Sequence, residues 1–195
     1  MKFEEGNLYH IYNRGNNKQP IFFKPDNYLF FIKKIRKYIL PHCEILAYCL
    51  MPNHFHFLVY STAQTIATKF IAGKEKNVLS EGVKNLLSSY TQAINKQNNT
   101  TGSLFQQNTK AKLIKKESRT YDLICMNYIH QNPMRARIVK KMEDWIYSSF
   151  CDYCNLRKGT LCNKGVATTL LDLNMKIFYE DSYKMISEDQ TKKLF

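Results

Sequence analysis

The sequence contains no long apolar run, and this excludes one class of protein. No window of its 195 residues approaches the roughly 18 consecutive apolar side chains that a bilayer-spanning helix needs. Its first residues, MKFEEGNLYH, also contain no apolar segment of the kind found in secretory leaders. We therefore expect a cytoplasmic protein that has no membrane partner.

Acidic residues are few. The chain has 16 Asp and Glu against 29 Lys and Arg, which gives a formal net charge of +13 and a pI near 9.4. Because 44% of the residues are hydrophobic, this charge belongs to a folded protein and not to a disordered tail. A small, strongly basic domain favours a polyanionic partner, and nucleic acid is the commonest one.

The six cysteines do not complete a zinc site. Cys151 and Cys154 have the spacing of a zinc-binding pair and Cys162 follows them, but no fourth Cys or His comes after Cys162. In a protein without a secretory leader, we expect these cysteines to be reduced thiols.

The elements expected from hydrophobic periodicity alternate along the chain, without repeats or low-complexity segments. Ser118 is a candidate N-cap of the last helix before Pro133, which should end it. The order fits an α+β sandwich, a central antiparallel sheet with helices on one face. Residues 1–154 would form this domain, and residues 155–195 an extension of loop plus short helix. The expected strands are 7–13, 43–51, 54–60 and 111–115, and the expected helices are 26–40, 62–72, 83–97, 118–132 and 166–180.

His54 and His56 stand two residues apart in a strand-like run. Alternate residues of a strand point to the same face, so both imidazoles should project together while Phe55 and Phe57 enter a core. Two neutral imidazoles on one face can form two ligands of a metal site. The same pair also fits two partly exposed histidines on a polar sheet face.

Tyr128 and Asn132 are four residues apart on a predicted helix, which places them on one helical face. An amide oxygen at Asn132 would add a third ligand to the His54 and His56 pair. Such a mixed nitrogen and oxygen site suits Mg²⁺ or Mn²⁺. Tyr128 would then be a nucleophile beside a metal, although a core tyrosine followed by a helix stop gives the same local pattern.

The chain resembles the REP-associated tyrosine transposases, a branch of the single-tyrosine HUH transposases. The resemblance covers roughly residues 7–150, and its motifs fall in the order found in that family. The matching segments are 9–16 (YHIYNRGN), 47–59 (AYCLMPNHFHFLV), 102–106 (GSLFQ), 128–136 (YIHQNPMRA) and 145–150 (WIYSSF).

The resemblance implies a ferredoxin-like transposase domain that cleaves and rejoins single-stranded DNA, often beside a hairpin, in the nucleoid. It implies that His54 and His56 bind a divalent metal, with Asn132 nearby as a further ligand. Tyr128 would form a 5′-phosphotyrosine link and release a 3′-hydroxyl. Related transposases act either as homodimers or as monomers.

DNA contacts are expected at Arg14, Asn16, Lys112 and Arg135, which lie in or next to the matched motifs. The chain departs from the family after Phe105 and Gln106. A Gly and an Arg are common there, whereas this sequence has Gln107 and Asn108. Lys110 or Lys112 could supply the missing basic contact. Two other functions fit the same features: a non-catalytic single-stranded nucleic-acid-binding protein, and a metal-dependent nuclease that uses water.

Overall fold

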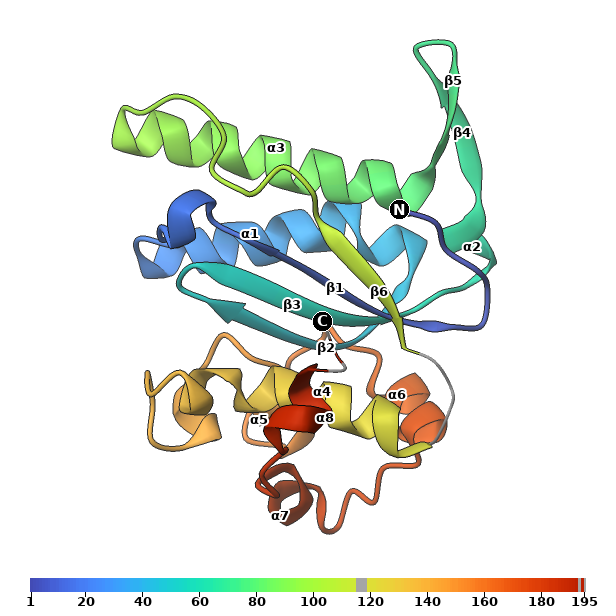
Figure 1. Ribbon diagram of the computed structural model, residues 1–195, viewed down its shortest axis with the longest axis vertical. Helices are drawn as coiled ribbons and strands as arrows, with labels where there is room; N and C mark the ends of the chain where they lie inside the picture. The colour runs from blue at the N-terminus through green and yellow to red at the C-terminus, as the bar shows by residue number, and fades with distance from the viewer. Residues whose placement is uncertain (115–118, 193, 195) are drawn as a thin grey trace.

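A four-stranded antiparallel sheet lies at the centre of the computed structural model, which describes residues 1–114, 119–192 and 194. The strand order is β2-β3-β1-β6 (Figure 1). Helix α1 follows β1 and helix α3 precedes β6, so the connection is β-α-β-β-α-β, the ferredoxin-like arrangement. The expected α+β class is confirmed. The elements are β1 (Leu8–Arg14), α1 (Pro25–Tyr38), β2 (Glu44–Met51), β3 (His54–Tyr60), α3 (Val78–Asn98) and β6 (Lys110–Ile114).

One face of the sheet packs against α1 and α3, which lie side by side above it in Figure 1. Phe55 and Phe57 point into this core and are almost fully buried, as their alternation with the two histidines predicted. From α1 and α3, the core receives Phe31 and Tyr90, whose rings meet edge to face with centroids 4.8 Å apart. The aromatic and β-branched side chains of this face hold the strands in register.

A second helical layer covers the opposite face, where helices on only one face were expected. Helix α4 packs there on β2 and β3, with Cys125, Met126 and Ile129 fully buried. Residues 155–192 complete this layer and contribute Leu171, Phe178 and other apolar side chains to its core. The layer consists of α4 (Arg119–Arg135), α5 (Phe150–Tyr153), α6 (Lys164–Leu171), α7 (Phe178–Ser182) and α8 (Glu188–Lys192).

The segment expected as a helix over 62–72 is a single helical turn followed by the first strand of a β-hairpin. A single helical turn, α2 (Ala63–Ile66), leads into β4 (Thr68–Ile71) and β5 (Lys74–Asn77). The hairpin projects from the fold in Figure 1. Ala72 and Gly73 both have positive φ, as a two-residue hairpin turn with the right twist requires. Ala-Gly is not a common sequence for such a turn, so the sequence pattern did not indicate it. Short 3₁₀ helices complete the fold: η1 (Asn16–Lys18), η2 (Leu40–His42) and η3 (Met142–Asp144).

Pro133 does not end its helix. Helix α4 runs on to Arg135, with Pro133 inside its last turn. At this position the missing proline N–H removes only one helical hydrogen bond. The following turn is held by bonds from Ala136 to Asn132 O and from Ile138 to Pro133 O, each 2.9 Å. The expected N-cap Ser118, and Lys115 at the end of the expected strand, lie outside the described residues.

The helix expected over 166–180 is two helices, α6 and α7, separated at Asp172, which has a left-handed backbone conformation. In the described part of the chain, no helix combines the length and apolar character needed to cross a bilayer.

Asp152 should be essential for the stability of the second layer. Its carboxylate is almost fully buried and accepts bonds from Arg157 Nε at 2.6 Å, Arg157 Nη2 at 2.8 Å and Gly159 N at 3.1 Å. Asp152→Ala removes the anion that faces Arg157, whose side chain is 36% exposed and keeps its bonds to Tyr48 Oη and Ser148 O. The substitution should therefore lower the free energy of unfolding by about 2 kcal/mol. Urea denaturation measures this. Asp189→Ala removes an exposed pair with Lys192 and should change the free energy by less than about 0.5 kcal/mol; equal effects would contradict the prediction.

Candidate functional site

On the sheet face that meets α4, the side chains change from apolar to polar along the strands. At one end, Leu8, Leu58 and Ile114 join the apolar core. Towards the other end the same face carries polar and aromatic side chains, because strand residues two apart share a face. Register places Tyr12 opposite His56 and Arg14 opposite His54, while Lys110 pairs with Tyr12. This polar end of an otherwise apolar face is where a site forms.

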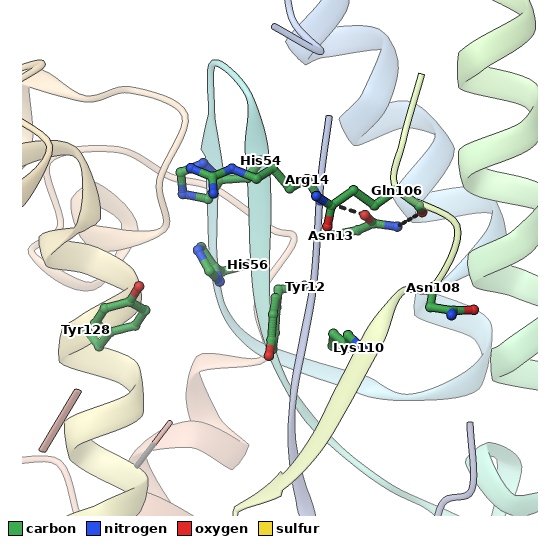
Figure 2. Close-up of a pocket in the computed structure, with 9 residues that line it drawn as sticks. All are labelled: Tyr12, Asn13, Arg14, His54, His56, Gln106, Asn108, Lys110 and Tyr128. Carbon is green, nitrogen blue, oxygen red and sulfur yellow. Dashed lines mark hydrogen bonds between the residues drawn. The ribbon is translucent and has the colours of Figure 1, made fainter. Parts of the chain in front are cut away.

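A cavity of about 300 Å³ lies between this polar end and α4 (Figure 2). Strand β1, strand β3 and the segment leading into β6 form one side, and Tyr128 of α4 approaches from the other. The cavity therefore joins segments more than 100 residues apart in the sequence. It is lined by Tyr12, Asn13, Arg14, His54, His56, Gln106, Asn108, Lys110 and Tyr128.

The two histidines project into the cavity together, as expected. Their ring centroids are 5.0 Å apart and the rings are almost perpendicular. His54 Nδ1 lies 2.6 Å from Asn53 Oδ1, and His56 Nδ1 lies 2.8 Å from His10 Nε2. Both Nδ1 atoms are thus engaged by neighbouring protein groups, so Nε2 is the ring nitrogen of each through which a metal would bind.

Burial keeps these imidazoles neutral. It lowers the pKa of His54 to about 4, with a smaller lowering from the positive charge of Arg14. Burial also lowers the pKa of His56 well below its usual range, assisted by His10, His54 and Arg14. A metal ligand must offer an unprotonated nitrogen, so at neutral pH the pair is in the state that binding requires.

Tyr128 lies beside His56, one of the two histidines. Its ring meets that of His56 edge to face, with centroids 5.7 Å apart, and the side chain is 9% exposed. Burial raises its pKa, whereas the Asn132 amide and the charge of Arg135 act in the opposite direction. The phenol is thus neutral at pH 7, and any reaction through its oxygen requires activation by a cation or base.

Asn132 connects the helix to the histidines. Its Nδ2 donates to Tyr128 O at 2.9 Å, as expected for residues four apart on one helical turn. The Asn132 amide also acts on the ring of His54, raising its pKa against the larger effect of burial. Asn132 is almost fully buried and does not line the cavity itself.

These donors fit a divalent cation. Two neutral imidazoles and an amide supply nitrogen and oxygen ligands, which suit Mn²⁺ and permit Mg²⁺. Across the described ranges, no three His, Cys, Asp or Glu side chains form a cluster that could hold a metal. A cation held by His54 and His56 would therefore complete its coordination with oxygens from an amide, phosphate or water.

The four residues expected to contact DNA occupy different environments. Arg14 lines the cavity, and its buried Nε has no hydrogen-bond partner among the described residues. Asn16 donates to Ser103 O at 2.8 Å, and Lys112 pairs with His10 across the sheet; neither lines the cavity. Arg135 instead holds the C-terminal segment, through Ile186 O at 2.9 Å and Thr191 Oγ1 at 3.3 Å.

Sequence reasoning did not single out His10, Tyr12, Asn13, Gln106 or Asn108 as site residues. The signal for the first two was present, because His10 and Tyr12 alternate with Arg14 along one strand and so share its face. Gln106 and Asn108 lie in an irregular segment whose position depends on tertiary contacts, such as the bond from Asn13 Nδ2 to Gln106 O at 3.1 Å (Figure 2).

Comparison with known proteins shows a likeness of fold. No protein-family model and no curated protein matches the sequence. Among solved structures, the fold matches one described as a REP-associated tyrosine transposase bound to a REP hairpin, with a TM-score of 0.54 and 18% identity. The match covers 77% of this chain and 79% of the other. The resemblance seen in the sequence motifs is therefore confirmed at the level of the fold: the chain folds as that REP-associated tyrosine transposase does.

Proposed function

We propose that this protein is a transposase-type enzyme that cleaves and rejoins single-stranded DNA through a covalent bond to Tyr128. The observation that carries the proposal is the position of Tyr128, edge-on to His56 in a cavity that also contains Arg14 and Lys110. A nucleophile, a candidate metal-binding pair and positive charge thus meet at one place. The motifs carrying the family resemblance supply the histidines and the tyrosine, which supports the same conclusion.

In the proposed reaction, Tyr128 Oη attacks the phosphorus of a phosphodiester. The new bond joins tyrosine to the 5′-phosphate, the bond from phosphorus to the 3′ oxygen breaks, and that oxygen gains the proton that the phenol loses. His54, His56 and Asn132 would hold Mg²⁺ or Mn²⁺. When bound, the cation would polarise the phosphate and stabilise the leaving oxygen. One phosphodiester replaces another, so a 3′-hydroxyl can reverse the step and strands can be rejoined without ATP.

The surrounding charge supports a nucleic-acid substrate. The net charge of +13 attracts a polyanion, and Arg14 carries a buried donor atom into the cavity. Lys110 lines the same cavity as Asn108, whereas Lys112 does not. The family commonly has an Arg where this chain has Gln107 and Asn108, and we therefore assign the missing basic contact to Lys110. The structural neighbour is described as bound to a REP hairpin, so a strand beside a hairpin is the substrate we propose.

Arg14→Gln should weaken binding to single-stranded DNA and reduce its dependence on salt. Loss of one phosphate contact releases one fewer counterion, so the slope of log affinity against log salt should become shallower by about 0.7. Fluorescence anisotropy between low and moderate salt measures both quantities. Lys192→Gln, which removes an exposed charge from α8, is the matched control and should leave the slope nearly unchanged. Equal slopes for wild type and Arg14→Gln would exclude Arg14 as a phosphate contact.

The experiment that tests the proposed function uses hairpin-bearing single-stranded DNA with randomised flanks, labelled at its 3′ end, since the adduct should retain the 3′ fragment. The protein and DNA are incubated with Mn²⁺ and separated on a denaturing gel. A labelled band that migrates with the protein, and that a chelator prevents, supports the proposal. Free fragments with 5′-phosphate ends would instead identify a nuclease that uses water. Binding without cleavage under all metal conditions would identify a non-catalytic binding protein.

A further inference from the structure

His10 links the candidate metal-binding pair to the C-terminal end of the chain. Its Nε2 lies 2.8 Å from His56 Nδ1, and its Nδ1 lies 3.3 Å from Leu194 O. The rings of His10 and His56 are stacked, with centroids 5.0 Å apart. His10 and Leu194 are fully buried, and His56 is almost so. A hydrogen-bonded series therefore runs from the backbone near the C-terminus, through one imidazole, to a second imidazole at the cavity.

The direction of each bond follows from the group at its end. A backbone carbonyl only accepts, so the bond to Leu194 O requires a proton on His10 Nδ1. A second proton on His10 would place a cation in a fully buried position, which is costly. His10 Nε2 is then an acceptor, and the bond between the rings must be donated by His56 Nδ1. The lone pair of His56 is consequently on Nε2.

His54 is held in the same way by a different group. Asn53 Nδ2 donates to Lys18 O at 3.1 Å, which turns Oδ1 of the same amide towards His54. Because that oxygen only accepts, His54 Nδ1 must donate the 2.6 Å bond between them. The two histidines thus carry their protons on Nδ1, through acceptors that come from different parts of the chain.

We infer that His10 is a positioning residue that holds His56 in the Nδ1-protonated tautomer and directs its Nε2 lone pair at the metal, and that Asn53 does the same for His54. This inference rests on the proposed function for the identity of the bound group. Histidines that ligate metals generally donate their second N–H to an acceptor that fixes the tautomer and the ring orientation. Here one acceptor is itself a histidine, and the carbonyl of Leu194 fixes that histidine in turn.

The tautomers can be measured without metal or DNA. Two-bond ¹H–¹⁵N correlation spectra of the wild-type protein distinguish the protonated ring nitrogen from the unprotonated one, and single-histidine variants assign the signals. We expect Nδ1–H for His10, His54 and His56. A proton on Nε2 of His56 would overturn the inference, whether or not the proposed function is correct.

The effect on metal binding is measured by calorimetric titration of Mn²⁺ into the protein. His10→Leu removes the acceptor and should weaken Mn²⁺ binding about 10- to 100-fold. His10→Gln keeps an amide oxygen at the position and should lose less affinity than His10→Leu. Tyr9→Phe is the matched control, because Tyr9 is the neighbour of His10 on the opposite face of β1.

The outcomes separate the two proposals. Mn²⁺ binding that depends on His54 and His56 but is unchanged in His10→Leu would overturn the inference and leave the proposed function intact. Failure of the wild-type protein to bind Mn²⁺ would contradict the metal in the proposed function, and the spectra would still decide the hydrogen-bond series.

Discussion

Tyr128→Phe is expected to abolish formation of the DNA-linked protein and to lower the rate of strand cleavage at least about a thousandfold, because no other group then supplies the nucleophilic oxygen. The substitution removes one oxygen from a side chain that is 9% exposed and leaves its ring against His56, so the fold should be retained. The labelled-strand assay measures both the adduct and the cleaved fragment. DNA affinity, measured separately, should change little.

Tyr12 provides the matched control for this prediction. It is the second tyrosine of the cavity, with its ring centroid 5.8 Å from that of His56. Tyr12 comes from the sheet and Tyr128 from α4, so they approach the histidines from different sides (Figure 2). Tyr12→Phe should retain the adduct. If Tyr12→Phe loses the adduct and Tyr128→Phe keeps it, the nucleophile is on the strand and our assignment is wrong.

His56→Ala should have a comparable effect on activity through a different cause. Removing one imidazole ligand should weaken Mn²⁺ binding at least about a hundredfold and reduce cleavage in proportion at limiting metal. His54→Ala should behave in the same way, since the two rings face the same cavity. Calorimetric titration of Mn²⁺ measures the affinity, and cleavage at increasing Mn²⁺ concentration shows whether excess metal restores activity.

His42→Ala is the control for the histidine substitutions. His42 lies in η2, at the end of the segment that follows α1, and is not part of the cavity. Its replacement should leave Mn²⁺ affinity and cleavage unchanged. Wild-type affinity in both His54→Ala and His56→Ala would show that the metal, if the reaction uses one, binds elsewhere.

Much of the central domain could be predicted because its elements have strong local signals. Short runs of apolar, aromatic and β-branched residues predicted β1, β2, β3 and β6 to within a residue or two, and helical spacing predicted α1. The β4–β5 hairpin was missed because its strands are short and exposed, and its Ala72-Gly73 turn is uncommon. The start of α3 was placed five residues too late, since the N-cap bond from Ser80 N to Asn77 Oδ1 was not recognised.

The candidate site was predictable only in part, because local sequence patterns pair neighbouring residues but do not bring together residues far apart in the chain. Strand and helix periodicity place His54 with His56 and Tyr128 with Asn132. That these two pairs meet depends on how α4 packs on the sheet, which the family resemblance implied and local pattern could not. Arg135 is the opposite case. It was expected to contact DNA, but its guanidinium donates to Ile186 O and Thr191 Oγ1, which lie more than 50 residues later in the chain.

The central claim is that Tyr128 forms a covalent bond with DNA, and mass spectrometry of the adduct tests it most directly. The protein is incubated with Mn²⁺ and hairpin-bearing single-stranded DNA, the complex is digested with nuclease and protease, and the modified peptide is sequenced. We predict a nucleotide joined through its 5′-phosphate to the peptide that contains Tyr128. A nucleotide on Tyr12 or any other residue, or cleaved DNA with no modified peptide, would contradict the account.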